Sequence, residues 1–380
     1  MPKLLAESSR KFGEGVRTAP RRIRRYPRLT TTTSLDDLCD QLARRANELD
    51  LSGHWPSEQL ALLGEHGVYR WFVSSEDGGV GSDDASILDG YVRLASACLT
   101  TAFVLTQRST ACGLIANSEN ESLRRELLPG LADGSLFATV GFSHLTTSRQ
   151  HVREPVLRAE ATSGGYRING YAPWVTGASN ADVIVTGATL PNGEQFLAAI
   201  PGNAPGVEAA TFEKLVALSA SKTGRVDYHD VDVTADQIVA GPIEQVMTHR
   251  KKGGTGGLFT SALAIGLARA ATNFLRAESS HRAELEAAAR AFATDVEDLR
   301  SELLDIAQGR ANNAESLRAR SNTLALNAAH ASLSAAKGTG FVAGHATGRW
   351  CREALFFLVW SCPKPVAEAN LCELARLGDR

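Results

Sequence analysis

The hydrophobic pattern divides the chain into three segments. Residues 34–134 show apolar positions at helical spacing, whereas the period falls to two between residues 136 and 242. Apolar residues recur every three or four positions in an amphipathic helix and every second position in a half-buried strand. The alternation slips by one residue near Asp230, which predicts a bulge or a bend. Helical spacing returns after the glycine-rich stretch 253–257, so the pattern predicts helical, β and helical segments in that order.

The first helical segment has a stripe at Leu38, Leu42 and Ala46, and it contains two breaks. Three glycines lie within residues 75–81, and residues 128–134 read Leu-Pro-Gly-Leu-Ala-Asp-Gly. Glycine and proline interrupt helices because of their backbone geometry. We therefore expect one turn at each position, the second just before the first strand.

The last segment contains the clearest helix. Its apolar residues follow a 4-3-4-3-4-3 spacing: Leu285, Ala289, Phe292, Val296, Leu299, Leu303 and Ile306. With helices predicted over 258–278 and 317–336, it forms a C-terminal bundle. This stripe and the apolar segment 355–360 exceed what one small bundle buries. We therefore expect a homodimer or homotetramer.

The most informative stretch is 164–182, GGYRINGYAPWVTGASNAD. Asn169-Gly170 between two alternating runs predicts a hairpin turn. Trp174 and Thr176 are two positions apart on the following strand, so their side chains share one face. An indole beside a hydroxyl suits a flat heterocycle, because one group covers the ring and the other hydrogen-bonds its edge. An ordinary half-buried strand is the alternative interpretation.

The stretch resembles the acyl-CoA dehydrogenase superfamily motif Gly-x-Lys-x-Trp-Ile-Thr-Asn-Gly followed by Ala-Asp. The turns at 75–81 and 128–134 are similar to that superfamily's Pro-Glu-x-x-Gly-Gly-x-Gly loop and Leu-Pro-x-Leu-Ala-x-Gly junction. The order of helical and β segments is also that of the superfamily, and the resemblance covers roughly residues 35–375.

The resemblance implies an α+β multidomain fold. It comprises an N-terminal α-helical domain, a middle β-barrel-like domain and a C-terminal four-helix bundle. We expect these domains at 34–135, 136–245 and 246–380, preceded by a basic flexible arm at 1–33.

The resemblance also implies FAD as the cofactor. The flavin ring would lie against Trp174, Val175 and Thr176, with Ser143 supplying a hydroxyl. The family's arginine at the FAD pyrophosphate corresponds to Arg282. Its glycine-rich turn near the dinucleotide, contributed in some members by a neighbouring subunit, corresponds to Gly338 and Gly340; a plain helix-ending turn is the alternative there.

The catalytic base is where the chain departs from the family. Removal of a proton α to a thioester carbonyl needs a positioned base. The family's two glutamate positions correspond here to Ser361 and Gly256. His144, which titrates near neutral pH, is the leading substitute, with a solvated loop histidine as the alternative.

Three functions remain open from the sequence. The first is FAD-dependent oxidation of an acyl-thioester or related substrate, with a non-standard base and an electron-transfer partner. The second is a two-component flavin monooxygenase supplied by a flavin reductase, and the third is a non-catalytic binding protein of the same fold.

Composition narrows the setting. Apolar residues make up 43% of the 380 residues, charged residues 22%, and the net charge is −2. These values favour a globular cytoplasmic protein and do not indicate nucleic-acid binding or membrane insertion. The six cysteines show no spacing typical of a metal site, so we expect buried free thiols. The basic residues before position 28 favour a mobile arm over a targeting presequence.

Overall fold

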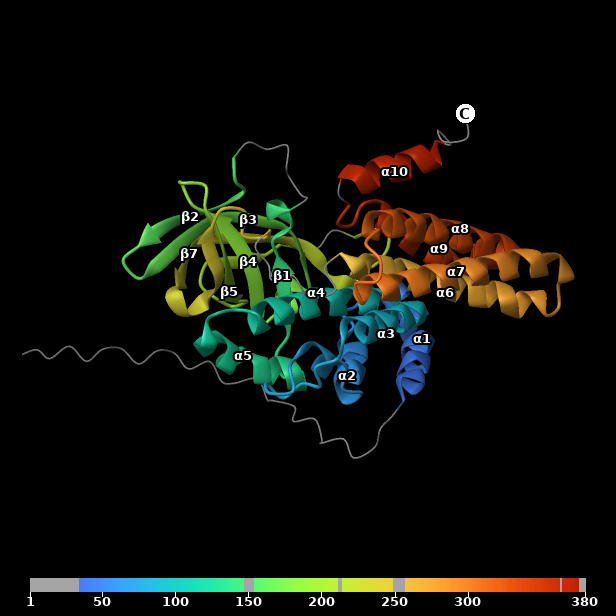
Figure 1. The fold of residues 1–380 in the computed structure, drawn as a ribbon, viewed down its shortest axis with the longest axis horizontal. Helices are drawn as coiled ribbons and strands as arrows, with labels where there is room; N and C mark the ends of the chain where they lie inside the picture. The colour runs from blue at the N-terminus through green and yellow to red at the C-terminus, as the bar shows by residue number, and fades with distance from the viewer. Residues whose placement is uncertain (1–33, 147–153, 211–213, 249–256, 363, 376–380) are drawn as a thin grey trace, which may run out of the picture.

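The computed structural model describes residues 34–146, 154–210, 214–248, 257–362 and 364–375, and the elements occur in the predicted order. Figure 1 shows the β-domain at one end of an elongated molecule and the helices α6–α9 at the other. Helix α4 lies between them, and α3 packs against α6 and α7. The two helical domains share one hydrophobic core, to which α1, α3, α4, α6, α7 and α8 all contribute.

The N-terminal domain consists of five helices. They are α1 (Leu35–Ser52), α2 (Ser57–Glu65), α3 (Asp84–Ala97), α4 (Leu99–Ala116) and α5 (Glu121–Asp133). The predicted stripe of Leu38, Leu42 and Ala46 is buried. The predicted break at 128–134 is displaced: α5 continues through Pro129 and ends only where Gly134 adopts a left-handed backbone. A glycine tolerates that conformation without steric cost.

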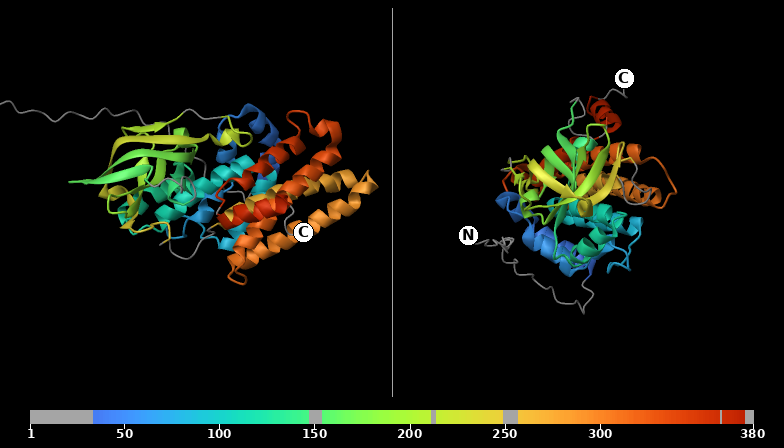
Figure 2. Two further views of the ribbon diagram at one scale, coloured as in Figure 1. Left: turned by 90° about the horizontal axis from the view of Figure 1, so that it is seen from above. Right: turned by 90° about the vertical axis from the view of Figure 1, so that its left-hand side faces the viewer.

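The middle domain is an eight-stranded sheet. Its strands are β1 (Ala138–Gly141), β2 (Leu157–Thr162), β3 (Gly165–Thr176), β4 (Val183–Thr189), β5 (Gln195–Pro201), β6 (Val207–Ala209), β7 (Thr223–Thr234) and β8 (Ile238–Ile243). The order is β6-β7-β3-β2-β4-β5-β8, with β1 paired to β4. One face, with Ile168 and Phe196, forms the domain's own core, and the other packs on α4 and α5. Figure 2 looks onto this curved sheet in its right-hand view.

The predicted hairpin at Asn169-Gly170 is wrong, because β3 runs straight through it. β3 pairs with β7 on both sides, and two β7 residues, His229 and Asp230, oppose Asn169. Asp230 is left-handed, and its N–H donates to Asn169 Oδ1 at 2.9 Å. A Cβ on Gly170 would lie 2.1 Å from the Val156 carbonyl oxygen. The Asn-Gly pair therefore forms a bulge, which confirms the slip predicted near Asp230.

The C-terminal domain contains the predicted helices. They are α6 (Leu258–Ser279), α7 (Glu286–Ala307) and α8 (Ala314–Gly340), followed by α9 (Ala346–Ala354) and α10 (Lys364–Leu374). α6 is long and apolar enough to cross a membrane, but 72% of its apolar window is buried inside the fold. It packs against α3, α7 and α8, as the core helix of a bundle does.

The apolar stripe of α7 is largely used within the chain. Ala289, Val296, Leu299 and Leu303 are buried against neighbouring helices. The stripe therefore does not by itself require a second subunit. The segment 355–360 does leave apolar surface, with Val359 75% exposed. The six cysteines are all free, but only Cys98 and Cys112 are fully buried, so the expectation of buried thiols holds for those two.

Two buried charged groups lie in the helical domains, and the first links α4 to α5. Arg108 of α4 is 1% exposed, and its Nη2 donates to the carbonyl oxygens of Leu131 and Leu136. Its guanidinium carbon lies 3.6 Å from the centre of the Tyr69 ring. Burial lowers the pKa of Arg108. The Arg108 side chain thus links the C-terminal end of α5 to α4.

The second group is an ion pair within α9. Arg349 Nε lies 3.6 Å from Glu353 Oε1, and the side chains are 5% and 2% exposed. Glu353 Oε2 has no hydrogen-bond partner among the described residues. Burial therefore raises the pKa of Glu353 to about 7, although Arg349 opposes the shift.

Candidate active site

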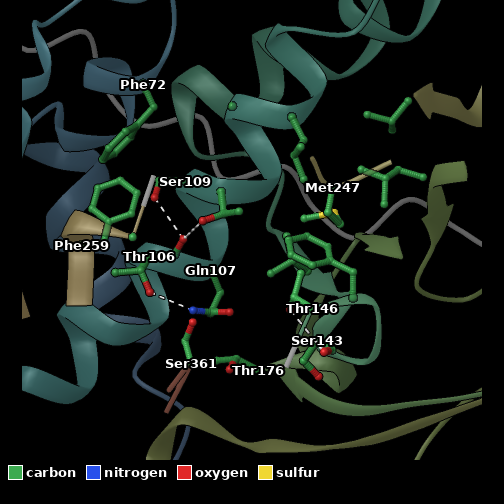
Figure 3. A pocket seen from close by; sticks show the side chains of 18 of the residues that line it. Phe72, Thr106, Gln107, Ser109, Ser143, Thr146, Thr176, Met247, Phe259 and Ser361 are labelled. Carbon is green, nitrogen blue, oxygen red and sulfur yellow. Dashed lines mark hydrogen bonds between the residues drawn. The ribbon is translucent and has the colours of Figure 1, made fainter. Parts of the chain in front are cut away.

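A cavity of about 2060 Å³ lies where the three domains meet. α4 forms one wall, the ends of β1 and β3 form another, and β8 and residues 355–361 complete it. Drug-sized ligands occupy pockets of roughly 300–1,000 Å³. The cavity therefore has room for a large cofactor and a substrate together. Figure 3 shows side chains from all three domains pointing into it.

The β-domain wall carries the two residues singled out in the sequence. Trp174 and Thr176 both line the cavity, as their same-face spacing predicts. Pro173 and Trp174 oppose one residue of β7, so β3 bulges there and the indole is 55% exposed. Val175 points the other way, into the core of the β-domain. The Val175 side chain therefore does not line the cavity, which leaves only its backbone to meet a ligand.

Hydroxyl groups behind Thr176 form a short network. Thr176 Oγ1 lies 2.9 Å from Thr223 Oγ1, which lies 2.8 Å from Ser221 Oγ. Thr139 Oγ1 donates to the Thr176 carbonyl oxygen at 2.8 Å. Each hydroxyl can both donate and accept. The network fixes the position of Thr176 while leaving it able to bond a ligand.

Ser143 supplies a hydroxyl without a partner. It begins the single 3₁₀ turn Ser143–Leu145 after β1 and lines the cavity. Its Oγ is buried and makes no hydrogen bond with any described residue. A buried polar atom without a partner is costly and commonly marks a missing ligand. With the half-exposed indole and Thr176, these donors and acceptors fit the edge and face of a flavin ring.

α4 contributes a polar wall that the sequence analysis missed. Thr106, Gln107 and Thr110 lie on its cavity face, within the run Thr-Gln-Arg-Ser-Thr at 106–110. Apart from Thr100 and Thr101 near its start, the remainder of α4 is apolar, and the helix is buried on nearly every side. A polar run inside such a helix was the available signal, because buried polar residues need partners.

The remaining walls are apolar. Phe72, Phe259 and Met247 line the part farther from Thr176 in the view of Figure 3. Phe356 and Trp360 line the cavity from the C-terminal domain, and their rings stack with centres 5.0 Å apart. Such walls exclude water from a bound ligand.

Charged groups lie at the edges of the cavity. Arg352 is paired with Asp50, whose side chain is 7% exposed, at 2.5 Å, and this pairing raises the pKa of Arg352. Glu119 and Asp236 line the cavity but are exposed, and Asp84 is half-buried. The described lining contains no histidine or cysteine. Within this part of the chain, the interior of the cavity therefore presents neutral polar and apolar groups.

His144 is not placed where a catalytic base would be needed. Its side chain is outside the cavity lining, and its Nε2–H donates to the Gly187 carbonyl oxygen of β4 at 2.8 Å. Burial lowers the pKa of His144, with the bond to Gly187 opposing the shift. Successive side chains of a 3₁₀ turn point in different directions, so Ser143 enters the cavity and His144 does not. The expectation of a base at His144 is not supported by this geometry.

Ser361 does line the cavity, in a segment held by two buried side chains of α8. Arg318 Nη2 donates to the Trp360 carbonyl oxygen at 2.8 Å, and Asn322 Nδ2 donates to that of Phe357 at 3.1 Å. Ser361 itself has a left-handed backbone, with φ of 44°. Gly256, the other base position implied by the resemblance, lies outside the described residues.

The residues expected at the FAD dinucleotide lie elsewhere. Arg282 follows α6, and its Nη1 donates to the Ala335 carbonyl oxygen at 2.6 Å. Gly338 and Gly340 end α8, where Lys337 adopts a non-helical backbone, and none of the three predicted residues lines the cavity. Nearby Phe341 is 85% exposed. The structure thus brings Arg282 near the end of α8, away from Trp174 and Thr176.

Comparisons with known proteins agree with this architecture. Residues 33–135 match the model of the acyl-CoA dehydrogenase N-terminal domain family. A probable acyl-CoA dehydrogenase, YngJ of Bacillus subtilis (strain 168), is 27% identical over 64% of this chain and 65% of its own length. Dibenzothiophene monooxygenase of Rhodococcus erythropolis is 23% identical over 54% of this chain and 50% of its own length. The chain thus aligns with about half to two thirds of each relative.

Solved structures show the same fold. A glutaryl-coenzyme A dehydrogenase in complex with glutaryl-CoA superposes with a TM-score of 0.77 and 18% identity, covering 93% of this chain and 98% of that protein. FMN-bound TdsC from Paenibacillus sp. A11-2 gives a TM-score of 0.75 and 18% identity, covering 91% and 96%. The fold is therefore that of the acyl-CoA dehydrogenases. Residues 33–135 match this family's N-terminal domain, and the chain as a whole is similar to acyl-CoA dehydrogenases in sequence and fold.

Proposed function

We propose that this protein is a flavin-dependent oxidoreductase whose flavin ring lies in the three-domain cavity against Trp174 and Thr176. The observation that carries the proposal is the cavity wall itself. It combines a half-exposed indole, a hydroxyl fixed by its neighbours and the buried hydroxyl of Ser143, which no described residue hydrogen-bonds. FMN-bound TdsC, which has this fold, supports a flavin as the occupant.

Each residue has a distinct part in holding the ring. The Trp174 indole would cover one face, and the Thr176 and Ser143 hydroxyls would bond polar atoms at the edge. A bound flavin supplies two-electron transfer and, when reduced, reaction with oxygen. Phe356, Trp360 and the apolar residues opposite would keep water from the reacting atoms.

We propose oxygen-dependent monooxygenation as the reaction, with reduced flavin supplied by a partner reductase. Dehydrogenation of an acyl thioester requires a base beside the substrate α-carbon. The described interior of the cavity offers neutral groups there, including Ser361 at the family's base position. The similarity to a dibenzothiophene monooxygenase supports the same reading. Acyl-thioester dehydrogenation with an electron-transfer partner is the second candidate, supported by the similarity to YngJ.

FAD remains the proposed form of the flavin, bound by a homodimer or homotetramer. Arg282 and Gly338 lie together at the far end of the helical domain, where the same chain's ring site cannot use them. A second subunit would present them to the adenine half of the cofactor. Chromatography of the extracted flavin and light scattering of the holoprotein test both statements; bound FMN on a monomer would contradict them.

Substitutions in the cavity wall test the flavin site. Trp174→Ala removes a stacking surface worth about 1–3 kcal/mol per base-sized ring, so we expect roughly 10- to 100-fold weaker flavin binding. Thr176→Val removes one hydrogen bond, for which about a tenfold loss is expected. Thr162→Val, at an exposed position of β2, is the matched control. Flavin titrations with unchanged affinity in both cavity variants would count against the site.

A further inference from the structure

The orientation of the Gln107 side-chain amide follows from its neighbour. Thr106 Oγ1 donates its only proton to the Phe103 carbonyl oxygen at 2.7 Å. It can therefore only accept from Gln107, whose amide lies 2.9 Å away. This requires the nitrogen, Nε2, to face Thr106. The amide oxygen, Oε1, must then point away from Thr106.

Gln107 reaches the cavity from an otherwise buried helix turn. Thr106 is 2% and Ser109 4% exposed, whereas Gln107 and Thr110 are half-buried. Figure 3 shows the Gln107 amide extending into the pocket, with Thr176 and Ser361 at the same end. No described residue hydrogen-bonds Oε1. The amide is therefore a fixed acceptor that faces the cavity.

The cavity around this acceptor is suited to an uncharged ligand. Arg352, the cationic residue of the described lining, is neutralised by Asp50, and the carboxylates lie at exposed or half-buried positions. An acceptor that a bound ligand covers discriminates strongly, because a ligand without a donor leaves it unpaired.

We propose that Gln107 is a specificity-determining residue that selects an uncharged substrate carrying an O–H or N–H donor near the reacting atom. This inference rests on the proposed function, since it assumes that the substrate enters the same cavity as the flavin. It excludes a plain hydrocarbon acyl chain as the preferred occupant of this part of the cavity. Phenols, alcohols and secondary amides have the required chemistry.

Three matched probes test the proposal with the flavin-loaded protein. The three probes are monosubstituted benzenes of similar size. Phenol carries a hydrogen-bond donor, toluene carries neither a donor nor an acceptor, and benzonitrile carries an acceptor alone. Ligand-observed NMR is expected to show phenol binding about five- to tenfold more tightly than toluene, and benzonitrile no more tightly. Gln107→Met should remove the preference, and Thr106→Val should weaken it by freeing the amide to rotate. Thr162→Val, at an exposed position of β2 outside the cavity lining, should preserve it.

The outcomes separate this inference from the proposed function. Flavin absorption measured on the same samples reports whether the ring site is intact. A phenol-to-toluene ratio that Gln107→Met leaves unchanged would overturn the inference even with flavin bound. Preference for benzonitrile, or no measurable phenol binding to the unmodified protein, would overturn it equally.

Discussion

The cavity interior and the core of the helical domains contain different kinds of polar group. The helical domains bury ionisable groups, such as the Arg108 guanidinium and the Arg349–Glu353 pair. The described cavity interior presents hydroxyls and side-chain amides, with charges at its edges. Strongly shifted pKa values commonly mark active sites, but in this molecule the pKa values of Glu353 and Arg108 are shifted by burial outside the cavity. Neutral groups with open hydrogen-bonding capacity mark the site instead.

The largest effect on stability is expected when the buried contacts of Arg108 are removed. Arg108→Leu would leave the Leu131 and Leu136 carbonyl oxygens without their buried donor, at about 1–3 kcal/mol each. We therefore expect the free energy of unfolding to fall by about 3 kcal/mol or more, measured by urea denaturation. Arg125→Leu, whose side chain is 81% exposed on α5, should change it by less than about 0.5 kcal/mol. Similar losses in both variants would contradict the role of Arg108.

A second prediction concerns how the buried carboxyl group of Glu353 makes the free energy of unfolding depend on pH. The folded pKa of Glu353, about 7, lies above its ordinary value of 4.5, so the folded state binds the extra proton between these values. Stability therefore falls as pH rises through this window, by roughly 1–3 kcal/mol. Glu353→Gln should remove that dependence. The free energy of unfolding of the variant, relative to that of the unmodified protein, should therefore rise from pH 4.5 to 7. Parallel pH profiles for the two proteins would show that the shift is absent.

A smaller effect is expected at His144. Its folded pKa lies below 6.5, so the unfolded state binds more protons and stability is lost as pH falls below 6.5. His144→Gln keeps an N–H for the Gly187 carbonyl oxygen and should reduce that loss. Because the ring lies outside the cavity, flavin content and turnover should stay within about twofold, whereas loss of a general base costs roughly 10²–10⁴-fold. A large drop in turnover would contradict this prediction and indicate that His144 acts in catalysis.

The sequence predicted the order of the elements and the shared face of Trp174 and Thr176. Helical and strand periods are local, so the three segments and the shared face of Trp174 and Thr176 could be read directly. The Asn169-Gly170 pair misled because its bulge depends on β7, a strand distant in sequence. The direction of His144 depends on the path of a short turn against β4, which no local pattern records. Gln107 was missed because the orientation of its amide depends on the hydrogen bonds that Thr106 makes with Phe103 and Gln107 in the folded helix.

Anaerobic mixing of the flavin-loaded protein with butyryl-CoA tests the central claim most directly. The account predicts that the visible flavin absorption persists, because the carboxylates of the described lining lie at its exposed or half-buried edges and not beside the substrate α-carbon. It also predicts that chemically reduced flavin in the same protein is reoxidised by oxygen. Rapid bleaching of the flavin by butyryl-CoA would contradict the account and show that a base acts in the cavity.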